Sequence, residues 1–312
     1  MQLHRSSGNW RLGLILTLIA VCIWGTLPIA LSIVLNALDV YTITWFRFLT
    51  AFIFLLLYLA VIRKLPKWQK INPASIKLFL VAIIFLICNY LFFLQGLQRT
   101  SPTNAKVFIQ LAPISLSLGA LIVFRERYTP KQWLGLSILI LGLTLFFHEQ
   151  LQTVLDAPNT YLLGNLILIL AAIVWGIYAL AQKQLLQTYS SAEVMLCIYG
   201  GCTLLLTPLA QPQNLITLSP LNFLVLLYCG FNTLIGYGCF GEALVHLEAS
   251  RVSAILTLTP LVTMICVQIF SGLFPQLLKA ENLTILAVIG AIVVVIGAAC
   301  VSLGKNKTSR KN

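Results

Sequence analysis

Hydrophobic residues run along the chain in ten long blocks, and short polar connectors separate each block from the next. A helix of about 20 apolar residues spans roughly 30 Å of hydrocarbon, because each residue adds about 1.5 Å. The pattern therefore predicts an all-α integral membrane protein with ten transmembrane helices. The predicted spans are residues 12–33, 41–62, 77–97, 102–124, 132–147, 162–185, 192–209, 221–244, 252–274 and 283–303.

Composition strengthens the membrane interpretation. Hydrophobic residues make up 59% of the chain and charged residues only 9%, against roughly half and a quarter in soluble domains. The formal charge of +12 would suggest nucleic acid if basic residues formed a patch, but they lie between the hydrophobic blocks. We therefore expect the lipid bilayer and a small-molecule substrate as partners, and no nucleic acid.

The basic residues also predict how the chain is oriented. Most of the 20 Lys and Arg residues lie near the two ends or in alternate connectors, such as residues 63–77 and 125–131. Positive flanks are retained on the cytoplasmic side of a membrane. The chain is therefore expected in a bacterial cytoplasmic membrane with both termini cytoplasmic. The first block, which follows Arg5 and Arg11, is too long for a signal-peptide core and is interpreted as a span.

Two halves of the chain, residues 12–147 and 161–303, repeat the same features in the same order. The matched pairs are Trp24-Gly25 with Trp175-Gly176, Tyr90 with Tyr237, Pro113 with Pro260, and Gly135 and Gly142 with Gly290 and Gly297. Because each half holds five spans, the second half must enter the membrane in the opposite orientation. Inverted repeats of this kind place a substrate site between the halves, near the bilayer midplane. This symmetry predicts a secondary transporter that works by alternating access.

A set of short motifs extends over nearly the whole chain. They are Trp24-Gly25, Arg47-Phe48, Ala112-Pro113, Arg125-Glu126-Arg127, Trp175-Gly176, Glu242-Ala243-Leu244, residues 248–253, Thr259-Pro260 and the late glycines. Together they resemble the EamA-type branch of the drug/metabolite transporter superfamily. The resemblance implies a ten-helix carrier with a central cavity, often one that exports amino acids or other small metabolites. One departure is that residues 271–275 lack the acidic residue usual in the family after the ninth span.

Ionisable residues inside spans are the first candidates for transport chemistry, because each costs roughly 2.5–3.5 kcal/mol to insert. Glu242, with His246 one helical turn later, is a candidate for proton coupling; alternatively, it pairs with Arg251 or caps the ninth span. Lys106 lies on a polar stripe of the fourth span, and it either meets a substrate anion or extends to the lipid headgroups. Arg47 is assigned a structural role, paired with a helix carbonyl end or a lipid phosphate.

Proline, polar and aromatic residues supply the remaining candidates. Pro113 and Pro260 cannot donate to the carbonyls of Ile109 and Leu256, so each helix is expected to bend there. These two prolines, together with Pro28, are the predicted hinges. Other substrate contacts are expected from Asn89, Tyr90, Gln110, Tyr237 and Thr257, and Trp24 and Trp175 are expected in the cavity wall.

Two other functions stay open. A flippase for lipids or lipid-linked sugars would use the same repeat, and a lateral opening between helices would favour it. An intramembrane enzyme is less favoured, because no predicted span contains aspartate and the chain has no GxSxG or HExxH motif. The eight cysteines form no CxxC pair. We therefore predict no catalytic residue, metal site or cofactor.

Overall fold

The computed structural model describes residues 9–66, 73–100, 105, 108–124, 128–148, 159–273 and 284–303. The regular structure within these ranges is helical. The helices are α1 (Trp10–Val34), α2 (Val40–Val61), α3 (Pro73–Arg99), α5 (Leu111–Val123), α6 (Pro130–Phe146), α8 (Asn159–Leu185), α9 (Ser191–Leu206), α10 (Pro220–His246), α11 (Ala249–Leu256), α12 (Thr259–Leu273) and α13 (Ile285–Leu303), and a short 3-10 helix, η2 (Pro212–Leu215), precedes α10.

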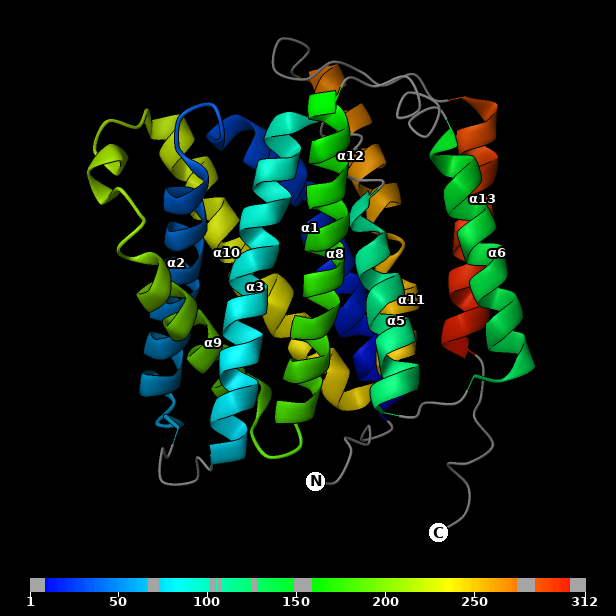
Figure 1. The fold of residues 1–312 in the computed structure, drawn as a ribbon, viewed down its shortest axis with the longest axis horizontal. Coiled ribbons are helices and arrows are strands. Elements are labelled where there is room, and N and C mark those ends of the chain that lie inside the picture. The colour runs from blue at the N-terminus through cyan, green and yellow to red at the C-terminus, as the bar shows by residue number, and fades with distance from the viewer. Residues whose placement is uncertain are drawn as a thin grey trace.

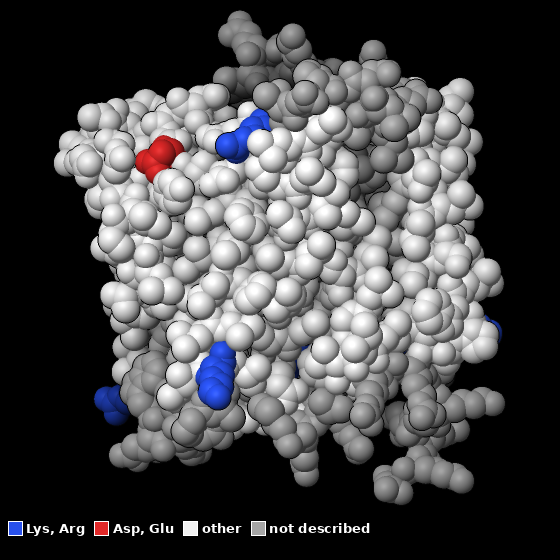
Figure 2. Space-filling model, in the orientation of Figure 1, with Lys and Arg blue, Asp and Glu red and all other residues white. Residues whose placement is uncertain are grey.

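Many of these helices have the length and composition of membrane spans. Six segments are long and apolar enough to cross a bilayer: α1, α2, most of α3, most of α8, α10, and α11 together with most of α12. Shorter apolar helices are α5, α6, α9 and most of α13. The charged side chains visible in Figure 2 lie towards the two ends of the bundle, with a broad uncharged band between them. The chain is therefore a helical, multi-pass membrane protein.

The helices stand side by side as a bundle (Figure 1). α3 packs along α8, α1 packs along α10, and α2 lies against both α9 and α10. At one edge of the bundle, α6 and α13 form a closely packed pair. Glycines allow this approach, since a Cβ at Gly290 would lie 2.3 Å from the Phe146 nitrogen and one at Gly142 would lie 2.6 Å from the Val294 nitrogen.

The predicted ninth span is not one continuous helix, and it is interrupted where the sequence predicted a bend, just before Pro260. α11 ends at Leu256 and α12 begins at Thr259. The cause is Pro260, which has no N–H to donate to the Leu256 carbonyl. The Thr259 hydroxyl donates to this oxygen instead, at 2.6 Å. The break therefore occurs where the backbone ladder loses a donor and a neighbouring side chain replaces it.

A similar interruption precedes Pro113 in the first half. Gln110 lies in a turn, and α5 begins only at Leu111. Within the predicted fourth span, residues 102–104, 106 and 107 lie outside the described residues. Pro28, by contrast, lies inside α1, which continues through it. Two of the three predicted hinge prolines therefore lie next to helix interruptions.

Candidate functional site

A cavity of about 140 Å³ lies at the centre of the bundle, with a wall formed by helices from both halves of the chain. Most of the predicted site residues line it: Trp24, Pro28, Asn89, Tyr90, Gln110, Pro113, Trp175, Tyr237 and Pro260. Three sets of matched residues, the tryptophans, the tyrosines and the prolines, thus meet around one space although about 150 residues separate the members of each pair.

Three predicted residues are not among those that line the cavity. Lys106 lies outside the described residues, so both roles considered for it stay predictions. Thr257 is buried, and its hydroxyl donates to the Ala254 carbonyl at 2.6 Å. That hydroxyl therefore supports the last turn of α11 and is not directed to the cavity wall.

Glu242, the third, lies near the C-terminal end of α10. Its carboxylate is 3.4 Å from Nε2 of His246, and 44% of its side chain is exposed. The alternative partner considered for it, Arg251, instead pairs with Glu248 at 3.1 Å. The structure therefore separates the predicted coupling carboxylate from the cavity and pairs it with a histidine on the same helix.

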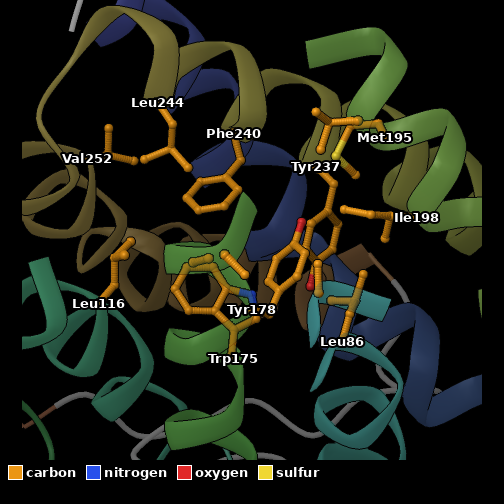
Figure 3. Packing of buried hydrophobic residues seen from close by; sticks show 14 of the residues in the cluster. Leu86, Leu116, Trp175, Tyr178, Met195, Ile198, Tyr237, Phe240, Leu244 and Val252 are labelled. Carbon is orange, nitrogen blue, oxygen red and sulfur yellow. The ribbon is translucent and has the colours of Figure 1, made fainter. Parts of the chain in front are cut away.

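Aromatic rings form much of the cavity wall. The Trp24 ring meets Tyr237 edge-on, with centroids 4.9 Å apart, and meets Trp175 edge-on at 6.2 Å. Phe240 packs behind them, 5.2 Å from Trp175. Figure 3 shows Trp175, Tyr178, Tyr237 and Phe240 gathered in one cluster. Edge-on and tilted contacts of this kind are favourable between aromatic rings, so they stabilise this apolar part of the wall.

Arg47, on α2, lines the cavity although sequence reasoning assigned it a purely structural role. Only 3% of it is exposed, and its Nε donates to the Thr233 hydroxyl at 3.0 Å. The guanidinium also lies over the Tyr90 ring, 4.4 Å from the centroid. An arginine inside an apolar span was the available signal, because such a residue normally faces a cavity or a partner.

No described carboxylate forms an ion pair with Arg47. The four described acids are engaged elsewhere: Asp39 caps α2, Glu193 caps α9, Glu242 faces His246, and Glu248 faces Arg251. The other four, Glu126, Glu149, Asp156 and Glu281, lie outside the described residues. Within the described part of the chain, the cavity therefore holds a positive charge with no protein counter-charge in contact.

Amide side chains add polar points to this wall. Gln110 is only 6% exposed, and its buried Oε1 accepts no hydrogen bond from the described residues. Asn89 differs, because its Nδ2 donates to the Ala171 carbonyl at 2.9 Å and so ties α3 to α8. Among the described side chains, no three His, Cys, Asp or Glu residues gather as a metal site. The contacts that the cavity offers are thus aromatic faces, one guanidinium and amide groups.

A multi-pass helical bundle with a central cavity walled by matched residues of two sequence halves has the architecture of a membrane transporter. The EamA-like transporter family matches this chain over residues 11–148 and again over residues 162–303. These matches cover most of the chain, so the protein belongs to the EamA-like transporter family. The resemblance drawn from its motifs is thereby confirmed.

Known proteins agree with this assignment. An "Uncharacterized inner membrane transporter YhbE" of Escherichia coli (strain K12) is 36% identical over 294 residues, which cover 94% of this chain and 92% of that protein. A "Probable amino-acid metabolite efflux pump" of Salmonella typhimurium is 24% identical over 294 residues, covering 90% and 92% of the two chains. A protein of known crystal structure shares the fold, with a TM-score of 0.70 and 16% identity over 93% of this chain and 97% of that one.

Proposed function

We propose that this protein is a secondary transporter that exports a small metabolite, an amino acid or a related solute, across a bacterial cytoplasmic membrane. The observation that carries the proposal is the central cavity, whose wall combines matched residues from both halves of the chain. The relative named as an amino-acid metabolite efflux pump supports the choice of cargo and direction. The relative named as an inner membrane transporter supports the location.

We propose further that the cavity opens alternately to each side through two inverted five-helix repeats, residues 12–147 and 161–303. Helix pairing supports this symmetry. Two contacts have the same form: α3 packs along α8, and α10 packs along α1. In two further contacts, α6 pairs with α13 and α2 pairs with α9. If α1 corresponds to α8 and α3 to α10, a two-fold rotation exchanges the first two contacts and maps each of the others onto itself.

The interruptions before Pro113 and Pro260 are the proposed hinges of this movement. Each lies in a lining helix at a corresponding position of its repeat, and each weakens the backbone ladder at one point. A helix that lacks a ladder hydrogen bond can change direction there with little loss of other bonds. Pro28 is a third proposed bend, within the continuous α1.

The structure gives no support to proton coupling through Glu242. Glu242 is not among the residues that line the cavity, and its exposed carboxylate faces His246, so neither observation supports a coupling role. We therefore propose cargo movement through the cavity without assigning the coupling proton to Glu242.

Transport by the purified full-length protein in lipid vesicles tests the proposal. Labelled amino acids, sugars and nucleosides are supplied with and without a pH gradient. We expect an amino acid or related solute to cross, and Trp175→Ala to reduce its rate because it removes part of the cavity wall. Leu134→Ala, on the exposed face of α6, is the matched control. Movement of labelled lipids with no movement of any solute would replace the proposal with the flippase alternative.

A further inference from the structure

We propose that Arg47 is an anion subsite of the cavity and selects cargo that carries a carboxylate. This inference rests on the proposed transport function and names a chemical requirement for its cargo. The first support is the cost of burial. A guanidinium stays protonated in proteins, and an isolated charge in an apolar span is expensive. Arg47 is 3% exposed and within the described residues has no carboxylate in contact, so an anion from outside the protein would supply the missing charge.

The geometry of Arg47 is the second support. Thr233 accepts a hydrogen bond from Nε, and the Thr233 hydroxyl itself donates to the Cys229 carbonyl on α10. The Tyr90 ring covers one face of the guanidinium. These two contacts fix the plane of the group but leave the terminal nitrogens, Nη1 and Nη2, without a described acceptor. Two parallel N–H groups held in one plane match the two oxygens of a carboxylate.

The rest of the wall indicates what the carboxylate is attached to. Gln110 lines the same cavity as Arg47, and its buried Oε1 accepts no hydrogen bond from the described residues. A ligand donor such as an ammonium group would satisfy this oxygen. The rings of Trp24, Trp175 and Tyr237 offer apolar faces to a hydrocarbon or aromatic side chain. An α-amino acid with an apolar side chain supplies all three features.

Three related compounds distinguish the contribution of the carboxylate from that of the ammonium group. Phenylalanine carries both charged groups, 3-phenylpropionate lacks the ammonium, and phenethylamine lacks the carboxylate. Binding to the purified full-length protein is measured by tryptophan fluorescence, which does not require transport. We expect phenylalanine and 3-phenylpropionate to bind about 10-fold to 100-fold more tightly than phenethylamine, as expected for hydrogen bonds to charged groups.

Substitutions at Arg47 and Gln110 test whether these residues cause the preference for the two acids. Arg47→Gln should remove the advantage of the two acids, whereas Arg47→Lys should keep part of it because the charge stays and the planar fork is lost. Gln110→Leu should weaken phenylalanine but not 3-phenylpropionate. Arg99→Gln is the control, because Arg99 is an exposed residue at the end of α3 that donates to the Gln95 carbonyl. Thermal unfolding of each variant checks that it is folded.

The outcomes distinguish this inference from the transport proposal. If phenethylamine binds as tightly as the acids, if no acid binds, or if folded Arg47→Gln and Arg47→Lys both keep the full preference, the anion subsite is wrong. Vesicles that still carry an amino acid or a related solute under those conditions would leave the transport proposal intact. Conversely, acid-selective binding that depends on Arg47, without movement of any solute, would support the subsite and reject transport.

Discussion

At the scale of single residues, the cavity wall depends on a glycine as well as on large aromatic side chains. Gly236 lies against the indole of Trp24, where a Cβ would be 2.3 Å from Nε1. Trp24 has little room to move, because Trp175, Tyr237 and Phe240 surround it at ring distances between 4.9 and 6.2 Å. Because Gly236 has no side chain, α10 leaves room for the indole of Trp24 in the cavity wall.

Gly236→Ala should therefore disturb the cavity. The added methyl group would force the indole or the helix to shift, at a cost of about 1–3 kcal/mol for an overpacked site. We expect a lower unfolding temperature, altered tryptophan fluorescence and slower transport in vesicles. Gly238→Ala is the matched control on the same helix, because a Cβ there meets nothing within 4 Å. Equal behaviour of the two variants would contradict this account of the wall.

The ionisable residues show the limit of what sequence can predict at this scale. Arg47 and Glu242 were both recognisable as charged groups inside apolar spans, yet their surroundings differ. Arg47 meets Thr233, which is 186 positions away, whereas Glu242 meets His246 one turn away. Local spacing predicted the second contact and could not predict the first. The aromatic and proline candidates were easier, because the internal repeat relates them directly.

Glu242→Gln is expected to leave transport nearly unchanged. The carboxylate is 44% exposed and does not line the cavity, and exposed ion pairs contribute about 0–1 kcal/mol. The measurement is the uptake rate with and without a pH gradient, together with thermal unfolding. Glu248→Gln, which removes the partner of Arg251, is a matched control. Selective loss of the response to the pH gradient in Glu242→Gln alone would restore the coupling role.

At the scale of elements, the hydrophobic pattern predicted where apolar helices lie but not where they are interrupted. Apolar residues continue on both sides of Thr257-Leu258, so hydropathy does not mark the break between α11 and α12. Pro260 causes the break because it has no N–H for the Leu256 carbonyl, and the Thr259 hydroxyl donates to that oxygen instead. The proline therefore predicts the place of the interruption, whereas the side chain that replaces the missing donor depends on local geometry.

Pro113→Ala and Pro260→Ala test whether these interruptions act as hinges. Alanine restores an N–H at each position and favours a continuous helix, so each variant should transport at least severalfold more slowly without losing thermal stability. Pro130→Ala is the control, because Pro130 occupies the first turn of α6, where proline is tolerated. Unchanged transport by both variants, with folding intact, would argue against hinges at these sites.

At the scale of the whole molecule, a few long helix contacts join the two halves of the chain. α3 with α8 and α10 with α1 are long contacts, and each joins the third helix of one half to the first helix of the other. The pair of α6 and α13 lies at one edge of the bundle (Figure 1). Each of these contacts joins the two halves, so neither half contains the complete cavity wall. This dependence explains why the cavity could be predicted from the repeat and the family resemblance but not from either half alone.

Opposite orientation of the two halves is the most direct whole-molecule prediction. Single cysteines are placed in a cysteine-free background at exposed connector positions, namely Ala37, Lys64, Thr188 and Gln213. A membrane-impermeant maleimide added to intact cells should label positions 37 and 213, and should reach 64 and 188 only after the membrane is permeabilised. Ala37 and Thr188 follow the first helix of their respective halves, so inverted repeats require them to lie on opposite sides. Labelling of both from one side would mean parallel halves, and the two-fold exchange of α1 with α8 could not then operate in the membrane plane.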